Sequence, residues 1–299
     1  MSATESPWAG ISQHIEAATG ERFAVKRQYS IGGGCVNAAY RVEGEHNSYF
    51  VKTNQIDKAF MFEAEAAGLA ELAGTGAVRV PIPVCSGGTG STAFLVLEYI
   101  PLVQGGHASQ CELGRQLAVM HQFEHGQFGW KQDNTIGTTL QDNTRTDSWI
   151  DFWRDSRLGV QVALAARHGA PDKLLRKAAQ LMSGLAVFFP DAQPKPSLLH
   201  GDLWGANWAA DQQGHPVVFD PAVYYGDRET DLAMTELFGG FSSGFYAAYH
   251  EAYPLDTGYA TRKILYNIYH VLNHFNLFGG GYALQAERMI DTLLSETGG

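Results

Sequence analysis

The sequence predicts an α+β fold with two lobes: an N-terminal lobe built on an antiparallel β-sheet with one key helix, and a larger, mainly helical C-terminal lobe. Two observations support this prediction. Short strand-like segments separated by turns occupy most of the first hundred residues, and long segments with helical composition dominate after Pro101. We therefore expect lobes at residues 1–100 and 101–299, which meet near residues 98–101.

The N-terminal lobe begins with a helical pattern and continues with strands. Trp8, Ile11 and Ile15 recur at helical spacing, which predicts an amphipathic helix. A stretch rich in Ala, Leu, Met and Glu, without an internal proline, predicts a second helix over residues 59–73. Five segments have the composition of strands: residues 23–29, 38–42, 48–52, 78–84 and 92–100.

The C-terminal lobe is expected to be mostly helical, with one short β-rich stretch near residues 200–220. The sequence shows no internal repeat and no low-complexity linker. The expected helices are residues 109–123, 149–167, 172–189, 231–252 and 261–276.

The composition argues against several classes of protein. The 299 residues carry 21 Lys and Arg against 31 Asp and Glu, and the net charge of −10 disfavours nucleic acid and anionic membranes as main partners. The three cysteines, Cys35, Cys85 and Cys111, match neither a disulfide framework nor a zinc pattern. Together with the lack of a signal-peptide pattern at the first residues, they predict a cytoplasmic protein.

The segment from residue 198 to residue 221 carries the strongest chemical signal. It reads His-Gly-Asp-Leu-Trp-Gly-Ala-Asn from His200 and continues, after an apolar strand, to an Asp-Pro pair. A carboxylate at Asp202, an amide at Asn207 and a second carboxylate at Asp220 have the spacing that phosphoryl transfer needs. The first would act near the acceptor hydroxyl, and the other two are oxygen ligands of the kind that Mg²⁺ prefers. The alternative is a pair of polar turns that flank a hairpin.

A glycine run in the N-terminal lobe could bring the backbone close to a triphosphate. Gly32, Gly33 and Gly34 lie between two predicted strands, and glycine avoids clashes between Cβ atoms and phosphate oxygens there. The run is not a Walker A loop, because the chain contains no Gly-Lys-Ser or Gly-Lys-Thr sequence. A hairpin turn without a ligand is the alternative interpretation.

Two further features would complete a nucleotide site. Lys52 ends the third predicted strand, and Glu65 follows on the predicted helix. A Lys held by a helix Glu is the arrangement that places an ammonium on the α- and β-phosphates in kinases, whereas the alternative is a solvated Lys at a strand end. Glu98, Tyr99 and Ile100 lie where the lobes join, and their backbone could pair with an adenine edge.

The order of these signals predicts a protein-kinase-like fold. A glycine loop, a strand Lys, a helix Glu and a hinge precede His-Gly-Asp-x-x-x-x-Asn and a later Asp. A Rossmann-type enzyme is the alternative, and it fails on two counts. The glycine run is not Gly-x-Gly-x-x-Gly at the start of a helix, and strands do not alternate with helices.

With these motifs the chain resembles the fructosamine kinase (ketosamine-3-kinase) family, within the larger group that includes aminoglycoside phosphotransferases and choline kinases. The resemblance runs from about residue 31 to the C-terminal region. It departs slightly at Ala206, where we expect Gly or Ser, and at Asp227, where His is common. The segments that carry it are Gly32–Asn37, Met61–Leu69, Asp133–Gly137 with Gln141 and Asn143, Trp149–Leu158, His200–Asn207 and Asp220–Asp231.

The resemblance implies a reaction and a role for each site residue. An enzyme of this family uses ATP and Mg²⁺ to phosphorylate the 3-hydroxyl of ketosamines of the fructosamine or ribulosamine type, which promotes deglycation. Asp202 would orient that hydroxyl as the base, and Asn207 and Asp220 would hold Mg²⁺. Lys52, anchored by Glu65, would contact the α- and β-phosphates.

Further roles follow from the same resemblance. Residues 98–100 would hold adenine. Trp204 would stack on the amine-bearing part of the acceptor, with a buried core aromatic as the alternative. His200 would brace the loop, and Asp231 would tie the chain after Asp220 to the helix that it opens, as an N-cap. No role follows for Asn134, Ile136, Gly137, Gln141 or Asn143.

Two other functions stay open on the sequence alone. One is a kinase of the same fold that acts on another hydroxylated metabolite, such as an aminoglycoside or choline, and the other is a nucleotide-binding pseudoenzyme. Gly201 stands where protein kinases carry an Arg that pairs with an activation-loop phosphate, which favours a small-molecule acceptor. The sequence does not separate a free ketosamine from a protein-linked one, and we expect a monomer.

Cys35 directly follows Gly34 in the glycine loop, where backbone N–H groups and Lys52 would favour its thiolate. Oxidation of that thiolate, or a disulfide with Cys35 of a second molecule, would deform the phosphate cradle. The alternative is an inert residue that fits the loop because it is small.

Overall fold

The computed structural model describes residues 6–32, 36–190 and 193–297, and the chain forms two compact units. The first unit comprises Met1–Ser109 and Ala209–Pro221, and the second comprises Gln110–Trp208 and Ala222–Gly299. Within the described part of the chain, no helix is long and apolar enough to cross a membrane.

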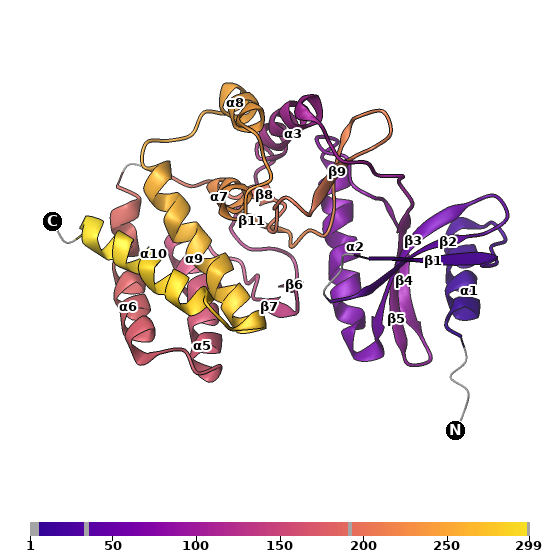
Figure 1. Cartoon of the computed structure of the whole chain (residues 1–299), viewed down its shortest axis with the longest axis horizontal. Helices are drawn as coiled ribbons and strands as arrows, with labels where there is room; N and C mark the ends of the chain where they lie inside the picture. The colour runs from indigo at the N-terminus through magenta and orange to yellow at the C-terminus, as the bar shows by residue number, and fades with distance from the viewer. Residues whose placement is uncertain (1–5, 33–35, 191–192, 298–299) are drawn as a thin grey trace. The chain divides into compact units, whose positions relative to one another are not determined.

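The first unit is built on a five-stranded antiparallel sheet with the order β1-β2-β3-β5-β4 (Figure 1). Its strands are β1 (Arg27–Ile31), β2 (Ala38–Glu43), β3 (Ser48–Gln55), β4 (Pro83–Thr89) and β5 (Thr92–Glu98). Its helices are α1 (Trp8–Thr19) and α2 (Ala59–Gly74), with a short 3₁₀ turn η1 (Ile56–Lys58) before α2. The predicted antiparallel sheet with one key helix is therefore confirmed.

The two faces of this sheet have different partners. On one face, Val51 and Val96 pack with Ile11 and Ile15 of α1, whose side chains are fully buried. Because successive residues of a strand point to opposite faces, Lys52 next to Val51 lies on the other face. That face is the one that α2 approaches, since Glu65 of α2 reaches Lys52 there.

Two predicted strands of the first unit begin later than the composition indicates. The segment predicted at residues 23–29 becomes a strand only at Arg27, because the backbone N–H of Phe23 donates to the side chain of Glu16 instead of a neighbouring strand. The segment predicted at residues 78–84 becomes β4 only at Pro83. Gly88 pairs with Ala93 in β4, and the end of the Ile56 side chain occupies the space beside its Cα.

The second unit is mainly helical, as predicted, and holds short two-stranded pairings (Figure 1). Its helices are α3 (His107–Met120, whose first residues belong to the first unit), α4 (Trp149–Phe152), the π-helix η2 (Trp153–Gly159), α5 (Val160–Arg167), α6 (Asp172–Ser183), the 3₁₀ turn η3 (Leu185–Phe188), α7 (Glu229–Leu237), α8 (Ser243–Ala252), α9 (Tyr259–Phe278) and α10 (Tyr282–Thr297). The short strands of this unit pair as β6 (Asn134–Ile136) with β7 (Thr139–Gln141) and β8 (Ser197–Leu199) with β11 (Tyr224–Gly226). The pair β9 (Trp208–Ala210) and β10 (Pro216–Val218) belongs to the first unit except for Trp208.

Three features of this unit differ from the sequence predictions. The helix expected over residues 231–252 is two helices, because Gly239 and Gly240 adopt φ angles of +73° and +105° that end α7. The strands β6 and β7 and the helix α10 were not predicted. The helix expected over residues 149–167 is continuous but contains the π-helical segment η2.

Candidate active site

The first unit holds an ion-pair cluster centred on Lys52. Its Nζ lies 2.6 Å from Glu65 Oε1 and 2.6 Å from Asp220 Oδ1. Only 6% of Lys52 is exposed. Burial alone would lower the pKa of Lys52, but the carboxylates of Asp220 and Glu65 outweigh that effect and raise the pKa above its ordinary value. The ammonium is therefore permanently charged, and two carboxylates hold it in place.

Asp220 takes an unusual backbone conformation. Its φ is +58°, and it is the only residue other than glycine with a positive φ in the described ranges. Asp tolerates the left-handed region better than most residues, but this conformation still costs free energy. Contacts in the surrounding structure must offset that cost. The result is a half-exposed carboxylate that meets the Lys52 ammonium.

The predicted hinge residues are held by side chains of the first unit. Glu98 donates its backbone N–H to the carbonyl of Ile82 at 2.9 Å. Its carboxylate forms an ion pair with Arg79 and accepts the N–H of Ile82. The guanidinium carbon of Arg41 lies 4.6 Å from the ring centroid of Tyr99. The contact of residues 98–100 with adenine stays a prediction.

The glycine loop is described only in part. A Cβ at Gly32 would meet no described atom within 4 Å, so this position lies in open surroundings. Gly33, Gly34 and Cys35 lie outside the described residues.

In the second unit, the loop from His200 to Asn207 follows β8 and packs on the segment that leads into β11. The N–H of Ala222 donates to the carbonyl of His200 at 2.8 Å. Gly201 has a φ of +82°, and a Cβ there would lie 2.0 Å from the carbonyl oxygen of Ala222. No side chain fits at position 201, which explains why this loop carries no Arg before Asp202.

Asp231 fixes this loop from α7. Its Oδ2 accepts the backbone N–H of His200 at 2.7 Å, and its Oδ1 accepts the N–H of Gly201 at 2.8 Å. The prediction that Asp231 is an N-cap is wrong, because α7 begins at Glu229 and the carboxylate is directed at another segment. Burial would raise its pKa, but hydrogen bonds from His121 and Gly201 lower the pKa below its ordinary value.

His121 and two residues behind it support Asp231. His121 Nε2 lies 3.1 Å from Asp231 Oδ2, and His121 Nδ1 lies 2.8 Å from the hydroxyl of Tyr249. Since the carboxylate only accepts, Nε2 carries the proton and Nδ1 accepts the Tyr249 O–H. Arg228 then donates to the Tyr249 oxygen at 3.1 Å. All four side chains are buried, so the loop rests on a rigid support.

Asp202 and Asn207 are joined within the loop. Asn207 Nδ2 donates to the carbonyl of Asp202 at 2.8 Å and to its Oδ2 at 3.2 Å. Both partners are acceptors, so the amide nitrogen faces Asp202 and the amide oxygen is directed away from it. The N–H of Asp202 donates to His200 Nδ1 at 3.3 Å, which shows that His200 braces the loop. Asp202 itself is half-buried.

Trp204 is not a core aromatic. It is 36% exposed, and its ring meets Phe238 edge-on with centroids 6.0 Å apart. The alternative that it is a buried packing residue is therefore wrong. Trp149 and Trp153, by contrast, are 4% and 0% exposed and serve packing.

A buried polar cluster contacts the segment that follows Asp220, and no role for its residues followed from the sequence. Asn134 Nδ2 donates to the carbonyl of Val223 at 2.7 Å. Its Oδ1 accepts hydrogen bonds from Gln141 and Asn143, both at 2.9 Å. Arg157, fully buried, donates to Asn143 Oδ1 at 2.7 Å. The Asn-Thr-Ile-Gly motif at residues 134–137, together with Gln141 and Asn143, was the sequence feature from which this cluster could have been found.

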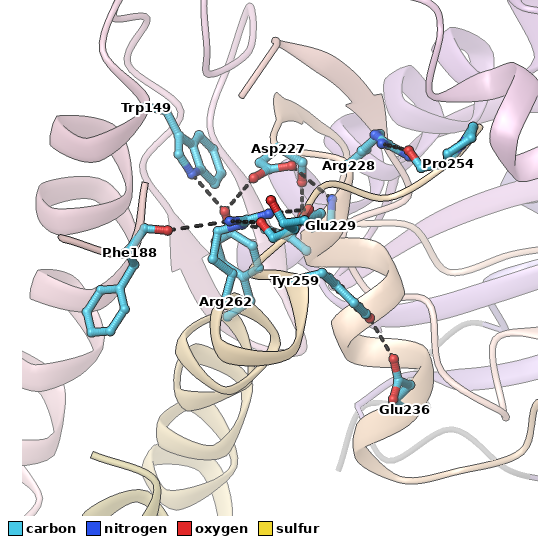
Figure 2. Close-up of polar contacts among 12 residues, drawn as sticks. Trp149, Phe188, Asp227, Arg228, Glu229, Glu236, Pro254, Tyr259 and Arg262 are labelled. Carbon is cyan, nitrogen blue, oxygen red and sulfur yellow. Dashed lines mark hydrogen bonds and ion pairs between the residues drawn. The ribbon is translucent and has the colours of Figure 1, made fainter. Parts of the chain in front are cut away.

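A second buried network fixes the turn before α7 (Figure 2). Arg262 donates to both carboxylate oxygens of Glu229 at 2.7 and 2.8 Å. Asp227 accepts the N–H of Glu229 at 3.0 Å and the hydroxyl of Tyr266 at 2.5 Å. Trp149 Nε1 donates to the same Tyr266 oxygen at 3.1 Å. The departure at Asp227 thus supplies a carboxylate that shapes the start of the helix carrying Asp231.

The comparisons with known proteins cover nearly the whole chain. The family model described as fructosamine kinase matches residues 7–296. A probable ketoamine kinase of Synechocystis is 48% identical and covers 97% of each chain. The chloroplastic protein-ribulosamine 3-kinase of Arabidopsis thaliana is 42% identical, over 89% of this chain and 82% of its own.

Solved structures agree with these matches. A crystal structure described as a fructosamine-3-kinase of Haemophilus somnus has a TM-score of 0.89 at 30% identity, over 96% of this chain and 97% of its own. A spectinomycin phosphotransferase, with a TM-score of 0.58 at 13% identity over 95% and 93%, shares the fold alone. The predicted protein-kinase-like fold is therefore confirmed.

Proposed function

Because the chain belongs to the fructosamine kinase family, we propose that it transfers the γ-phosphoryl group of ATP to the 3-hydroxyl of ketosamines. The observation that carries this proposal is the anchored pair of Asp202 and Asn207, held on a loop whose backbone is fixed by Asp231. A half-buried carboxylate at a fixed position is what an acceptor hydroxyl needs for orientation.

Asp202 is proposed as the base. It would accept a hydrogen bond from the 3-hydroxyl and receive the proton as the oxygen attacks the γ-phosphorus. Asn207 and His200 limit the motion of Asp202, since one donates to its carboxylate and the other accepts its N–H. Such positioning supplies much of the catalysis in phosphoryl transfer.

The first unit is proposed to bind the nucleotide. Lys52 would contact the α- and β-phosphates, with Glu65 keeping its ammonium in place. The backbone of Gly32, Gly33 and Gly34 would approach the phosphates, and residues 98–100 would hold adenine. In this proposal the lobe of residues 1–100 serves ATP, and the lobe of residues 101–299 serves catalysis and the acceptor.

Asn207 and Asp220 would hold Mg²⁺, and their chemistry fits that ion. Mg²⁺ prefers hard oxygen ligands, and few protein atoms suffice because phosphates and water supply the rest. The amide oxygen of Asn207 is directed away from Asp202, and the Asp220 carboxylate is half-exposed. Bound Mg²⁺ would neutralise charge on the transferred phosphate.

The proposed product explains a link to deglycation. A phosphate on C3 is a good leaving group next to the C2 carbonyl, so loss of a proton from C1 can expel it as inorganic phosphate. Water then hydrolyses the imine that is left at C1, which releases the free amine and a 3-deoxy dicarbonyl sugar. Both relatives carry ketosamine-type substrates in their names, a ketoamine for the Synechocystis protein and a protein ribulosamine for the Arabidopsis protein. We therefore propose free or protein-linked ketosamines as substrates.

The test is ATP turnover with fructosyl-, ribulosyl- and erythrulosyl-amines beside choline and an aminoglycoside. We expect turnover of ketosamines, with the phosphate on C3 by ³¹P and ¹³C NMR. Turnover of choline or the aminoglycoside alone would instead support the kinase of another metabolite. Nucleotide binding without turnover of any acceptor would support the pseudoenzyme.

We further propose a monomer in the cytoplasm. This proposal is supported by the sequence, in which the spacing of the three cysteines matches no disulfide framework. A disulfide-linked dimer through Cys35 is the alternative assembly, and Cys35 lies outside the described residues. Light scattering with and without reductant, together with cell fractionation, tests these proposals.

A further inference from the structure

Arg157 is a fully buried cation, and within the described residues it forms no ion pair. Its guanidinium donates instead to the backbone carbonyl of Asp142 at 2.8 Å and to Asn143 Oδ1 at 2.7 Å. Arg262, by contrast, is buried against the carboxylate of Glu229. A buried charge without a counter-charge costs free energy, so the groups around Arg157 must stabilise it in other ways.

Two aromatic rings contact the guanidinium of Arg157. Its central carbon lies 4.5 Å from the ring centroid of Phe152 and 4.1 Å from that of Tyr224, distances at which a ring attracts a cation. Tyr224 belongs to β11 and pairs with Leu199, the last residue of β8. The cation therefore contacts the strand pair from which the loop that carries Asp202 begins.

A chain of side-chain amides leads from Arg157 to the backbone of Val223. Asn143 accepts the guanidinium N–H at its Oδ1, and its Nδ2 donates to Asn134 Oδ1 at 2.9 Å. Asn134 Nδ2 donates in turn to the carbonyl of Val223 at 2.7 Å. The guanidinium only donates and the carbonyl only accepts, so the two ends fix the orientation of both amides. We call Arg157, Asn143 and Asn134 the amide relay.

The amide relay ends one residue after Ala222, which supports the loop. The N–H of Ala222 donates to the carbonyl of His200 at 2.8 Å, and Gly201 packs closely on the carbonyl of Ala222. Asp231 accepts the N–H groups of the same two loop residues. The backbone directly before Asp202 is thus held by α7 through its N–H groups and by Ala222 through a carbonyl.

We propose that Arg157 is a positioning residue for Asp202, and that it acts through the amide relay and through Tyr224. This inference rests on the proposed function, in which Asp202 is the base. A base must lie within hydrogen-bond reach of the acceptor hydroxyl, and a displacement of about 1 Å can cost roughly 100-fold in rate. A neutral apolar side chain at position 157 would neither orient Asn143 nor attract the ring of Tyr224, so the support of the loop would lose both restraints.

The test is a double-mutant cycle between Arg157→Met and Asp202→Asn. Arg157→Met alone should lower kcat roughly 10- to 100-fold, with the KM for ATP within about twofold. In the Asp202→Asn background the same change should lower kcat by less than about threefold, because the carboxylate that Arg157 positions is already absent. Arg157→Lys keeps the charge but lacks the planar guanidinium, so its kcat should be intermediate. An equal loss in both backgrounds would reject the proposal.

Leu158→Ala is the matched control for a loss of stability. Leu158 is the neighbour of Arg157 and is 1% exposed, and its apolar side chain forms no hydrogen bond in the amide relay. This variant should unfold at a lower urea concentration, with the kcat of the folded enzyme unchanged. A fall in kcat as large as that of Arg157→Met would show that packing alone is responsible and would reject the proposal.

Hydrogen exchange of residues 198–207, measured by mass spectrometry, separates this inference from the proposed reaction. Faster exchange of this segment in Arg157→Met than in Leu158→Ala, without ketosamine turnover by the parent, would keep the link between Arg157 and the loop and reject the reaction. Turnover by the parent, with equal exchange and with kcat unchanged in Arg157→Met, would reject the link and keep the reaction. Equal exchange without turnover would reject both.

Discussion

Asp231 Oδ1 accepts the backbone N–H of Gly201 at 2.8 Å, so a carboxylate on α7 fixes the residue directly before Asp202. The second oxygen of the same carboxylate holds the N–H of His200. Two backbone N–H groups thus bond one buried carboxylate. The position of the loop therefore depends on the charge and the two oxygens of that carboxylate.

Asp231→Asn should therefore damage both stability and turnover. An amide offers one oxygen, so one of the two buried N–H groups loses its acceptor at a cost of about 1–3 kcal/mol. A displaced Asp202 should lower kcat roughly 10- to 100-fold, with the KM for ATP within twofold. Urea unfolding and steady-state kinetics measure both effects. Asp155→Asn, on the surface of the same unit, is the control, and equal losses in both variants would contradict the assignment.

Asp202→Asn should separate chemistry from nucleotide binding. Loss of a general base lowers kcat by about 10²–10⁴, while ATP affinity should stay nearly unchanged. Asp220→Ala is the contrasting variant, because removal of a proposed metal ligand should weaken Mg·ATP binding. Kinetics and nucleotide titration measure the two effects, and near parental kcat in Asp202→Asn would show that the loop has another role.

His270 should make the fold sensitive to acid. Burial lowers the pKa of this 4% exposed side chain to about 3, and its Nδ1 has no hydrogen-bond partner in the described part of the chain. The unfolded chain binds the proton near pH 6.5, so stability is complete above that pH and is lost as the pH falls toward 3.

The measurement is urea unfolding at pH 7.5 and pH 5.5 for the parent and His270→Gln. For a group that titrates only in the unfolded chain, the parent should lose about 1.4 kcal/mol more than the variant. The same pH dependence in both proteins would show that His270 is protonated in the folded state.

Alkylating agents should modify Cys35 before Cys85. Burial raises the pKa of Cys85 to about 11, so this thiol stays protonated at neutral pH. Peptide mass spectrometry should find Cys35 modified first, with loss of activity and with protection by Mg·ATP. Cys35→Ser should stay active and resist the reagent, and equal inactivation of that variant would rule out a role for this thiol.

Local sequence rules were sufficient to predict a contact between a strand and the helix that follows it in the chain. Lys52 and Glu65 are thirteen residues apart, and the alternation of β3 leaves Lys52 on the face that α2 approaches. The sequence also indicated that Asp202 and Asn207 act together, and the structure joins them by hydrogen bonds, while their role in phosphoryl transfer stays a proposal.

The same rules failed where a contact with a distant part of the chain determines the partners of a residue. Capping preferences assigned Asp231 to the start of its own helix, but its partners are backbone groups thirty residues earlier. Gly88 has a low strand propensity, yet it pairs in β4 because β5 lies beside it and supplies the partner Ala93. No role for Asn134 could be predicted from the sequence, because the carbonyl that accepts its amide N–H, that of Val223, follows 89 residues later.

The contact between Lys52 and Asp220 has a consequence for the order in which ligands load. Glu65, Asp220 and Lys52 together carry one net negative charge before any ligand arrives, because the ammonium already serves as a counter-ion. Free magnesium therefore meets little excess charge and must compete with the ammonium for Asp220. A nucleotide that brings its own metal supplies phosphates for Lys52 and a cation for Asp220 in one event. We expect the free protein to take up the metal–nucleotide complex and not the bare ion.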